Sequence, residues 1–201
     1  MDREKYMDQR EVKLLRATAE NRAMKDLAAG RVGGVLAWAV VDVALSTGLR
    51  VSEIAALKVG DFDPKRAALK VRRLKRRKPA VETLAIGADL AEHLAEYIEH
   101  KRTLDQDTGK AAPLFLGKRG PLTASGLRQI WKRAIRDAGL PRELSVHCAR
   151  HTLAVALLAK TRNLRQVQKQ LGHASPATTA NMYADVPFDE MAAGVNGLYD
   201  D

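Results

Sequence analysis

The sequence predicts a mainly helical α+β domain, and three observations support this prediction. Apolar residues recur at helical spacing over most of the chain. Capping residues and glycines mark the ends of these helical stretches. Only the region from 68 to 86 changes to short, partly β-branched runs around a proline, which is typical of a β-hairpin. A helical domain with a small antiparallel sheet is therefore the expected fold class.

The N-terminal quarter is expected to hold three helices. Asp8 can cap a first helix that ends near Asn21. The stretch 31–45 is apolar on most faces, which predicts a central helix buried in the core. Gly48 suits the left-handed residue that ends such a helix. Ser52 is expected to cap a short third helix.

The middle of the chain predicts the small sheet and two more helices. The strands of the hairpin are expected at 68–73 and 81–86, and a helix at 89–102. A third short strand is expected at 114–116. The stretch 123–138 predicts a helix that begins at a capping threonine and ends before a glycine.

The C-terminal part predicts four further helices, at 147–160, 163–171, 175–183 and 187–196. The last of them is amphipathic. The chain contains no internal repeat, low-complexity tract or interdomain linker. A single domain is the simplest interpretation.

The charge of the chain indicates its partner. A net charge of +10 at pH 7 on 201 residues favours a polyanion, and nucleic acid before an acidic membrane surface. No apolar run approaches about 18 residues, and no signal peptide opens the chain. The single cysteine, Cys148, excludes an internal disulfide and fits a reducing cytoplasm.

Five residues are candidates for chemistry on a phosphodiester. His147 and Arg150 are spaced i and i+3 on a predicted helix, so both point the same way. An arginine fork can hold two phosphate oxygens, and a nearby imidazole can donate to a third or move a proton. His173 follows a helix-ending Leu-Gly pair, Tyr183 lies ten residues further on, and Arg50 precedes a short helix.

Each of these residues also has a purely structural interpretation. His147 could cap or pack, Arg150 could pair with a carboxylate, and Arg50 could form a salt bridge with Glu53. A histidine after a helix end is often an ordinary surface residue. Tyr183 taken alone would be a half-buried core tyrosine. The joint order of the five residues, and not any one of them, carries the prediction.

The sequence around these residues resembles the tyrosine recombinase (phage integrase) family over 8–186, which matches that family's catalytic domain. The first arginine box is similar to TGLRVSEI at 47–54. The second box is similar to HCARHT at 147–152, and the third to LGHASPATT at 171–179. The position of the nucleophile matches Tyr183 in NMYA.

The resemblance implies a role for each residue. Tyr183 would attack a scissile DNA phosphate and form a covalent 3′-phosphotyrosine, which releases a 5′-hydroxyl. Arg50 and Arg150 would hold the non-bridging oxygens and stabilise the transition state. His147 would accept the tyrosine proton, and His173 would hydrogen-bond the phosphate. No metal and no cofactor are needed, because the arginines supply the positive charge.

The family also places a lysine in the β-hairpin as the general acid for the leaving oxygen. The stretch 65–78 has nine basic residues of fourteen and no acidic one. It departs from the usual glycine-flanked pattern, so two lysines are candidates for the acid. Lys75 is the expected acid, and Lys78 is the alternate. The other basic residues of this stretch are expected to contact DNA phosphates. The expected DNA-binding residues are Arg72, Arg73, Arg76, Arg77 and Lys78.

The resemblance also sets expectations for organisation and partners. Residues 1–201 are expected to form one catalytic domain, with an N-terminal tail at 1–7 and a C-terminal docking helix or tail at 187–201. The N-terminal DNA-clamping domain of the family is expected to be absent, since 46 residues precede the first arginine box. The expected partner is double-stranded DNA, bound by a homotetramer on two duplexes, with a monomer possible in isolation. The expected location is the cytoplasm, at the nucleoid, without membrane contact.

Three alternatives have specific features of their own. His147 and His151 share the spacing of a zinc-protease helix, but Cys148 replaces the glutamate that such a site requires, and no third ligand is evident. A non-catalytic DNA-binding protein would use the same basic surface without forming an adduct. A type IB topoisomerase would share the phosphotyrosine chemistry but relax supercoils, and the recombinase boxes favour strand exchange.

Overall fold

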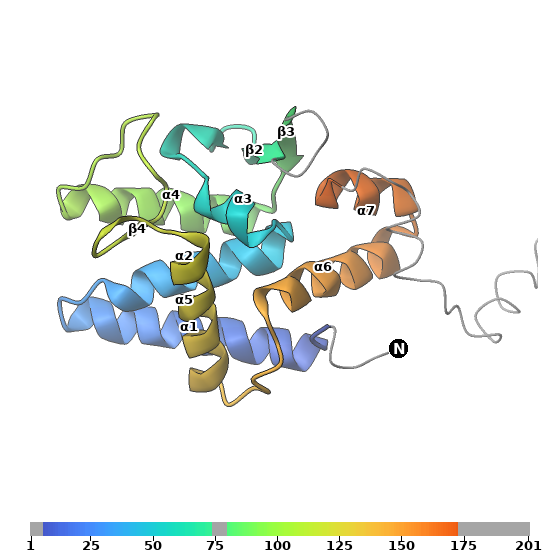
Figure 1. Cartoon of the computed structure of the whole chain (residues 1–201), viewed down its shortest axis with the longest axis horizontal. Helices are drawn as coiled ribbons and strands as arrows, with labels where there is room; N and C mark the ends of the chain where they lie inside the picture. Colours follow the sequence, from blue (N-terminus) through green and yellow to red (C-terminus); the bar gives the residue numbers. More distant parts are fainter. Residues whose placement is uncertain (1–5, 74–79, 173–201) are drawn as a thin grey trace, which may run out of the picture.

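Helices make up most of the molecule in a computed structural model that describes residues 6–73 and 80–172. Figure 1 shows α1 and α2 side by side, α4 on the other side of α2, and α5 running across them. Helices α6 and α7 form the side of the molecule next to the strands β2 and β3. The helices are α1 (Gln9–Ala28), α2 (Gly33–Thr47), α3 (Val51–Ala55), the 3-10 turn η2 (Val59–Asp61), α4 (Ala88–Thr103), α5 (Ala124–Asp137), α6 (Val146–Thr161) and α7 (Leu164–Leu171).

Local capping explains where the first two helices begin and end. Asp8 caps α1 as predicted: its Oδ1 accepts from the backbone N–H of Glu11 at 2.8 Å, and Glu11 reaches back to the N–H of Asp8. The helix continues past the predicted end near Asn21 to Ala28. Gly48 ends α2 in the left-handed conformation with φ +61°, which confirms that prediction.

The central helix α2 is the core of the fold. Its residues Ala39, Val40, Val41 and Val43 are completely buried. It packs against α1, α4, α5 and α6. A helix that is apolar on nearly every face requires this cover on all sides, so its position in the middle follows from its composition.

The main sheet has three antiparallel strands in the order β1 (Phe62–Asp63), β2 (Ala68–Arg73) and β3 (Ala80–Ala85). The predicted hairpin is confirmed, with Leu69 opposite Leu84. The third short strand predicted at 114–116 is not part of this sheet, and only Leu116 of that stretch lies in a strand. The backbone N–H of Leu114 instead donates to the carbonyl of Leu57 at 2.8 Å. A separate pair, β4 (Leu116–Gly117) and β5 (Gly120–Pro121), follows it.

The start of α3 also differs from the prediction. Arg50, not Ser52, occupies the capping position, and Ser52 lies inside the helix. The Oε2 atom of Glu53 accepts from the backbone N–H of Arg50 at 2.8 Å. A glutamate three residues into a helix can bond back to the capping N–H, and this interaction replaces the expected serine cap. The predicted helices at 175–183 and 187–196 lie outside the described residues.

No helix in the described part of the chain has the length and apolar character that crossing a bilayer would require.

Candidate functional site

A pocket of about 430 Å³ lies where the starts of α3 and α6 meet the side of α5. The short link after α2, the start of α3, one residue of α5 and the first turn of α6 with its capping serine form its wall. Arg50, His147 and Arg150 all line this pocket, although Arg50 and Arg150 are 100 positions apart in the chain. The structure therefore brings together all the predicted catalytic residues that it describes.

Arg150 is the buried member of the site. Its side chain is 3% exposed, with Nη1 donating to the carbonyl of Gly48 at 2.8 Å and Nη2 to that of Leu171 at 2.7 Å. Burial, followed by the charge of Arg50, lowers the pKa of Arg150 from its ordinary value to about 10, and the Glu53 carboxylate opposes the shift. Arg150 remains a cation at neutral pH. Two of the five N–H donors of a guanidinium are used in these bonds, which fix the orientation of the rest.

Arg50 lies at the mouth of the pocket and is partly exposed. Its Nη1 pairs with Glu53 Oε1 at 3.1 Å, so the salt bridge expected from a purely structural role is present. The Arg50 side chain is 30% exposed, whereas Glu53 is buried and lies behind it. The pair therefore holds the guanidinium of Arg50 in place without removing it from the pocket wall.

His147 lies in the first turn of α6 and is exposed. Ser145 caps this helix, and its Oγ accepts from the backbone N–H of His147 at 3.2 Å. The ring of His147 makes an edge contact with that of His151, with centroids 4.5 Å apart. Since Ser145 and Val146 also line the pocket, the positive end of a 16-residue helix adds to its charge.

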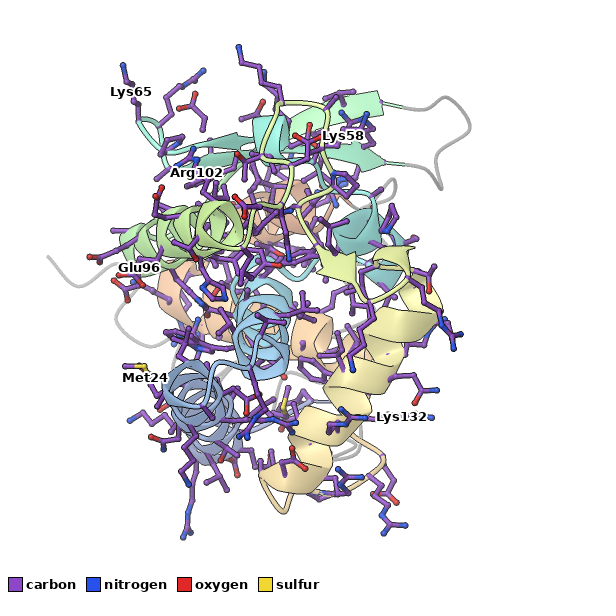
Figure 2. All side chains as sticks on the ribbon, turned by 90° about the vertical axis from the view of Figure 1, so that its left-hand side faces the viewer. Met24, Lys58, Lys65, Glu96, Arg102 and Lys132 are labelled. Atoms are coloured by element: carbon purple, nitrogen blue, oxygen red, sulfur yellow. The ribbon has the colours of Figure 1, made fainter. Side chains whose placement is uncertain are left out.

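Arg128 is a fourth basic residue of the pocket, and sequence reasoning missed it. It lies on α5, where the neighbouring residues Leu127 and Trp131 are buried in the core. An exposed arginine on an amphipathic helix has no local signal that separates it from an ordinary surface residue. Packing of α3 against α5 brings it to the site. One turn further along α5, Lys132 points away from the molecule (Figure 2).

The pocket is suited to a phosphate. Three guanidinium groups, an imidazole and two serine residues line it, and no acidic residue is among its described lining residues. When a nucleophile displaces a group from a phosphodiester, negative charge develops on the two non-bridging oxygens. Fixed cationic donors such as these stabilise that charge.

Two residues expected to bind DNA form ion pairs with carboxylates of the chain. Arg72 forms a bidentate pair with Asp61, with distances of 2.6 and 3.0 Å, and its side chain is 40% exposed. Arg73 is 1% exposed and pairs with Glu53 and Glu82. Direct DNA contact by Arg73 was therefore a wrong prediction for this conformation. The alternation of side chains along a strand shows which residues share a face, but it does not show which carboxylates lie under that face. The burial of Arg73 could therefore not be predicted from the run of basic residues.

The remaining predicted residues lie outside the described part of the chain. They comprise the nucleophile, the second histidine and four of the nine basic residues of the stretch 65–78. Within residues 6–73 and 80–172 there is no cluster of three or more His, Cys, Asp or Glu side chains that could hold a metal ion. The predicted site residues that lie outside the described part are Tyr183, His173, Lys75, Arg76, Arg77 and Lys78.

Comparison with known proteins finds relatives that are named tyrosine recombinases. The model of the phage integrase family matches residues 5–190. A tyrosine recombinase XerC of Herpetosiphon aurantiacus is 36% identical over 152 residues, covering 75% of this chain and 48% of that protein. Another XerC, of Roseiflexus sp., is 34% identical over 172 residues, covering 80% and 53%. The chain thus spans about half the length of the relatives that it matches.

Solved structures share the fold. The XerA recombinase has a TM-score of 0.73 at 25% identity, over 94% of this chain and 63% of that one. The XerH site-specific recombinase bound to its difH substrate has a TM-score of 0.72 at 22% identity, over 96% and 54%. The match to the family model, the boxes in their order and the pocket that joins them agree. The chain belongs to the phage integrase family, the tyrosine recombinases.

Proposed function

We propose that this chain is the catalytic domain of a site-specific DNA recombinase. The observation that carries the proposal is the pocket in which Arg50, His147 and Arg150 meet. These residues belong to two boxes far apart in sequence, and the family's chemistry needs them at one phosphate. The XerC relatives and the substrate-bound XerH structure support the same assignment.

The proposed reaction combines the residues of the pocket with those that the family resemblance assigns. The Tyr183 oxygen attacks the scissile phosphorus, the bond to the 5′-oxygen breaks, and a 3′-phosphotyrosine forms. His147 takes the phenolic proton, since a phenol with a pKa of about 10 needs a base and nearby cations to react at neutral pH. Lys75, or its alternate Lys78, gives a proton to the leaving oxygen. Arg50 and Arg150 hold the non-bridging oxygens, and His173 donates to one of them.

Rejoining reverses these steps. A 5′-hydroxyl from another strand attacks the phosphotyrosine, and the tyrosine oxygen leaves. One phosphoester is exchanged for another, so the reaction needs no high-energy cofactor. We propose that the protein acts in the cytoplasm on nucleoid DNA. Arg72, Arg76, Arg77 and Lys78 then contribute the phosphate contacts of the hairpin region.

Strand exchange joins two duplexes, so we propose four protomers on two DNA molecules. An apolar pocket of about 700 Å³ lies between the start of α1, the end of α2, the start of α4 and α6. We propose that the C-terminal stretch 187–201 of a neighbouring protomer docks there. Its apolar residues Phe188, Met191, Val195 and Leu198 match an apolar groove.

The test uses a pool of nicked suicide duplexes with randomised arms around the nick. We expect the wild-type chain to form an SDS-resistant adduct with DNA and Tyr183→Phe to form none, because only the phenol can make the bond. An adduct that persists in Tyr183→Phe contradicts the nucleophile assignment. Binding without any adduct from the wild type would favour the non-catalytic alternative. Relaxation of supercoiled plasmid without exchanged strands would favour the topoisomerase alternative.

A further inference from the structure

Arg73 stands where three segments of the chain meet, at the end of β2. Its Nε donates to Glu82 Oε2 at 2.9 Å and its Nη1 to Glu53 Oε2 at 3.1 Å. Its Nη2 donates to the backbone carbonyl of Gln170 at 3.1 Å. These partners belong to β3, α3 and α7. Because a guanidinium is planar and its donors are fixed in direction, one buried arginine sets the relative positions of all three elements.

Glu53 is the first connection from Arg73 to the pocket. Its Oε2 atom accepts from Arg73 and from the backbone N–H of Arg50, and its Oε1 atom pairs with Arg50 Nη1. The carboxylate is 2% exposed. A buried carboxylate held between two arginines cannot shift without moving both. The position of the Arg50 guanidinium therefore depends on Arg73, which itself does not line the pocket.

The last turn of α7 is the second connection. Arg73 binds the carbonyl of Gln170, and Arg150 binds the next carbonyl, that of Leu171, at 2.7 Å. The final carbonyls of a helix lack partners within the helix and carry the negative end of its dipole. A Cβ atom at Gly172 would stand 2.4 Å from Arg73 Nε, so this backbone lies directly on the guanidinium. The next residue in the chain is the predicted phosphate ligand of the third box.

We propose that Arg73 is a positioning residue for DNA cleavage by this chain. It holds Arg50 through Glu53, and it holds the end of α7, from which the chain continues to His173. It does so from the interior, without contacting DNA. This inference rests on the proposed function.

A role in folding alone makes a different prediction. The loss of a buried ion pair would then reduce the amount of folded protein, and each folded molecule would cleave DNA at the normal rate. A positioning role instead slows the chemical step in molecules that are fully folded. Small displacements of catalytic groups have large effects on rate, about a hundredfold for an error of about 1 Å.

The experiment compares four forms of the 201-residue chain: wild type, Arg73→Lys, Glu82→Gln and Lys101→Met. Arg73→Lys keeps the charge but not the planar fork, and Glu82→Gln provides a milder change if the lysine variant does not fold. Lys101→Met is the matched control, since Lys101 is also 1% exposed and its Nζ donates to two backbone carbonyls, but it does not line the pocket. For each form we measure the folded fraction by circular dichroism. We then measure affinity for an intact duplex pool, and the single-turnover rate of adduct formation with the nicked pool at saturating protein.

We expect the rate per folded molecule to fall about tenfold or more in Arg73→Lys and by a smaller factor in Glu82→Gln. The affinity for intact DNA should change less than about twofold, because Arg73 is not at the surface. Lys101→Met should keep the wild-type rate per folded molecule. The role of Arg73 is overturned if its variants cleave as fast as the wild type, if only affinity falls, or if the control loses as much rate. Absence of an adduct from the wild type overturns the proposed function itself, and the role of Arg73 with it.

Discussion

The arginines of the pocket differ in what their surroundings leave for a substrate. Arg150 is buried and bonded to two backbone carbonyls, so its position is fixed before any ligand arrives. Arg50 is fixed from behind by Glu53 and faces the pocket with a partly exposed side chain. Arg128 is exposed on α5, and the structure gives it a place in the pocket wall. A phosphate can thus meet two arginines with fixed positions and one that is able to adjust.

The exposed member of this set gives a prediction about affinity. Arg128→Ala should weaken DNA binding and lower the slope of log affinity against log salt concentration by about 0.9, the value for one phosphate contact. Stability should stay within about 0.5 kcal/mol of the wild type, because the side chain is exposed. Binding titrations between low and moderate salt measure the slope. The control is Lys25→Ala, an exposed basic residue of α1 that does not line the pocket. An unchanged slope in Arg128→Ala would show that this side chain makes no phosphate contact.

At the scale of elements, the end of α2 is the point where packing and chemistry share the same residue. Gly48 has a φ of +61° and ends the helix, and its carbonyl accepts from Arg150. An added Cβ would stand 2.8 Å from Leu171 Cδ2 and 3.0 Å from Leu153 Cδ2. Helices α2, α6 and α7 therefore meet at this glycine. Its small size and its conformation are both required.

Two glycines with the same conformation separate these requirements. Gly30→Ala and Gly48→Ala should each lose about 1–2 kcal/mol from the left-handed conformation, since φ is +65° and +61° at these positions. Gly48→Ala should lose about 1–3 kcal/mol more from overpacking, whereas a Cβ at Gly30 would meet nothing within 4 Å. Urea unfolding of both variants measures the difference. Equal losses would mean that the leucine side chains move aside without cost.

The first two boxes of the site could be found from the sequence because each box, like each helix signal, consists of a few neighbouring residues. The capping residue of α1, the glycine that ends α2 and the helix that carries Arg150 were all predicted from neighbouring residues. The strand β1 was missed because two residues are too few to show alternation. The start of α3 was misplaced because a glutamate bonding back to Arg50 competed with a serine that also favours capping positions.

At the scale of the whole molecule, a buried polar network joins three helices around the core. Asp42 of α2 is 6% exposed and accepts from Arg16 of α1, and its Oδ2 lies 2.8 Å from His93 Nδ1 of α4. Burial opposes ionisation of this carboxyl. The hydrogen bond from His93 and the charge of Arg16 outweigh burial, so the pKa of Asp42 is lowered from 3.8.

This shift predicts how stability depends on pH. A carboxyl whose pKa is lower in the folded state stabilises the fold above its unfolded pKa of about 3.9, and this contribution is lost as pH falls through the folded pKa. Asp42→Asn should therefore lose about 3 kcal/mol at neutral pH, and its stability should fall less steeply in acid. Denaturant unfolding between pH 7 and acid measures both effects. Asp105→Asn, at an exposed position, is the control. If the free energy of unfolding of Asp42→Asn falls as steeply in acid as that of the wild type, Asp42 is not the source of the acid dependence.

The sequence by itself determined the helical class of this protein, most helix ends and the order of the boxes that mark its family. Helix periodicity, helix ends and each single box depend on residues within a few positions of one another, and the order of the boxes can be read directly along the chain. Only the tertiary structure decided that Arg128 joins the pocket and that Arg73 lies inside the protein instead of on a DNA-facing surface. The partners of these arginines come from segments far away in the chain. The path of the backbone through space, and the carboxylates that it buries beneath each cation, set which charges face a substrate and which hold the site together.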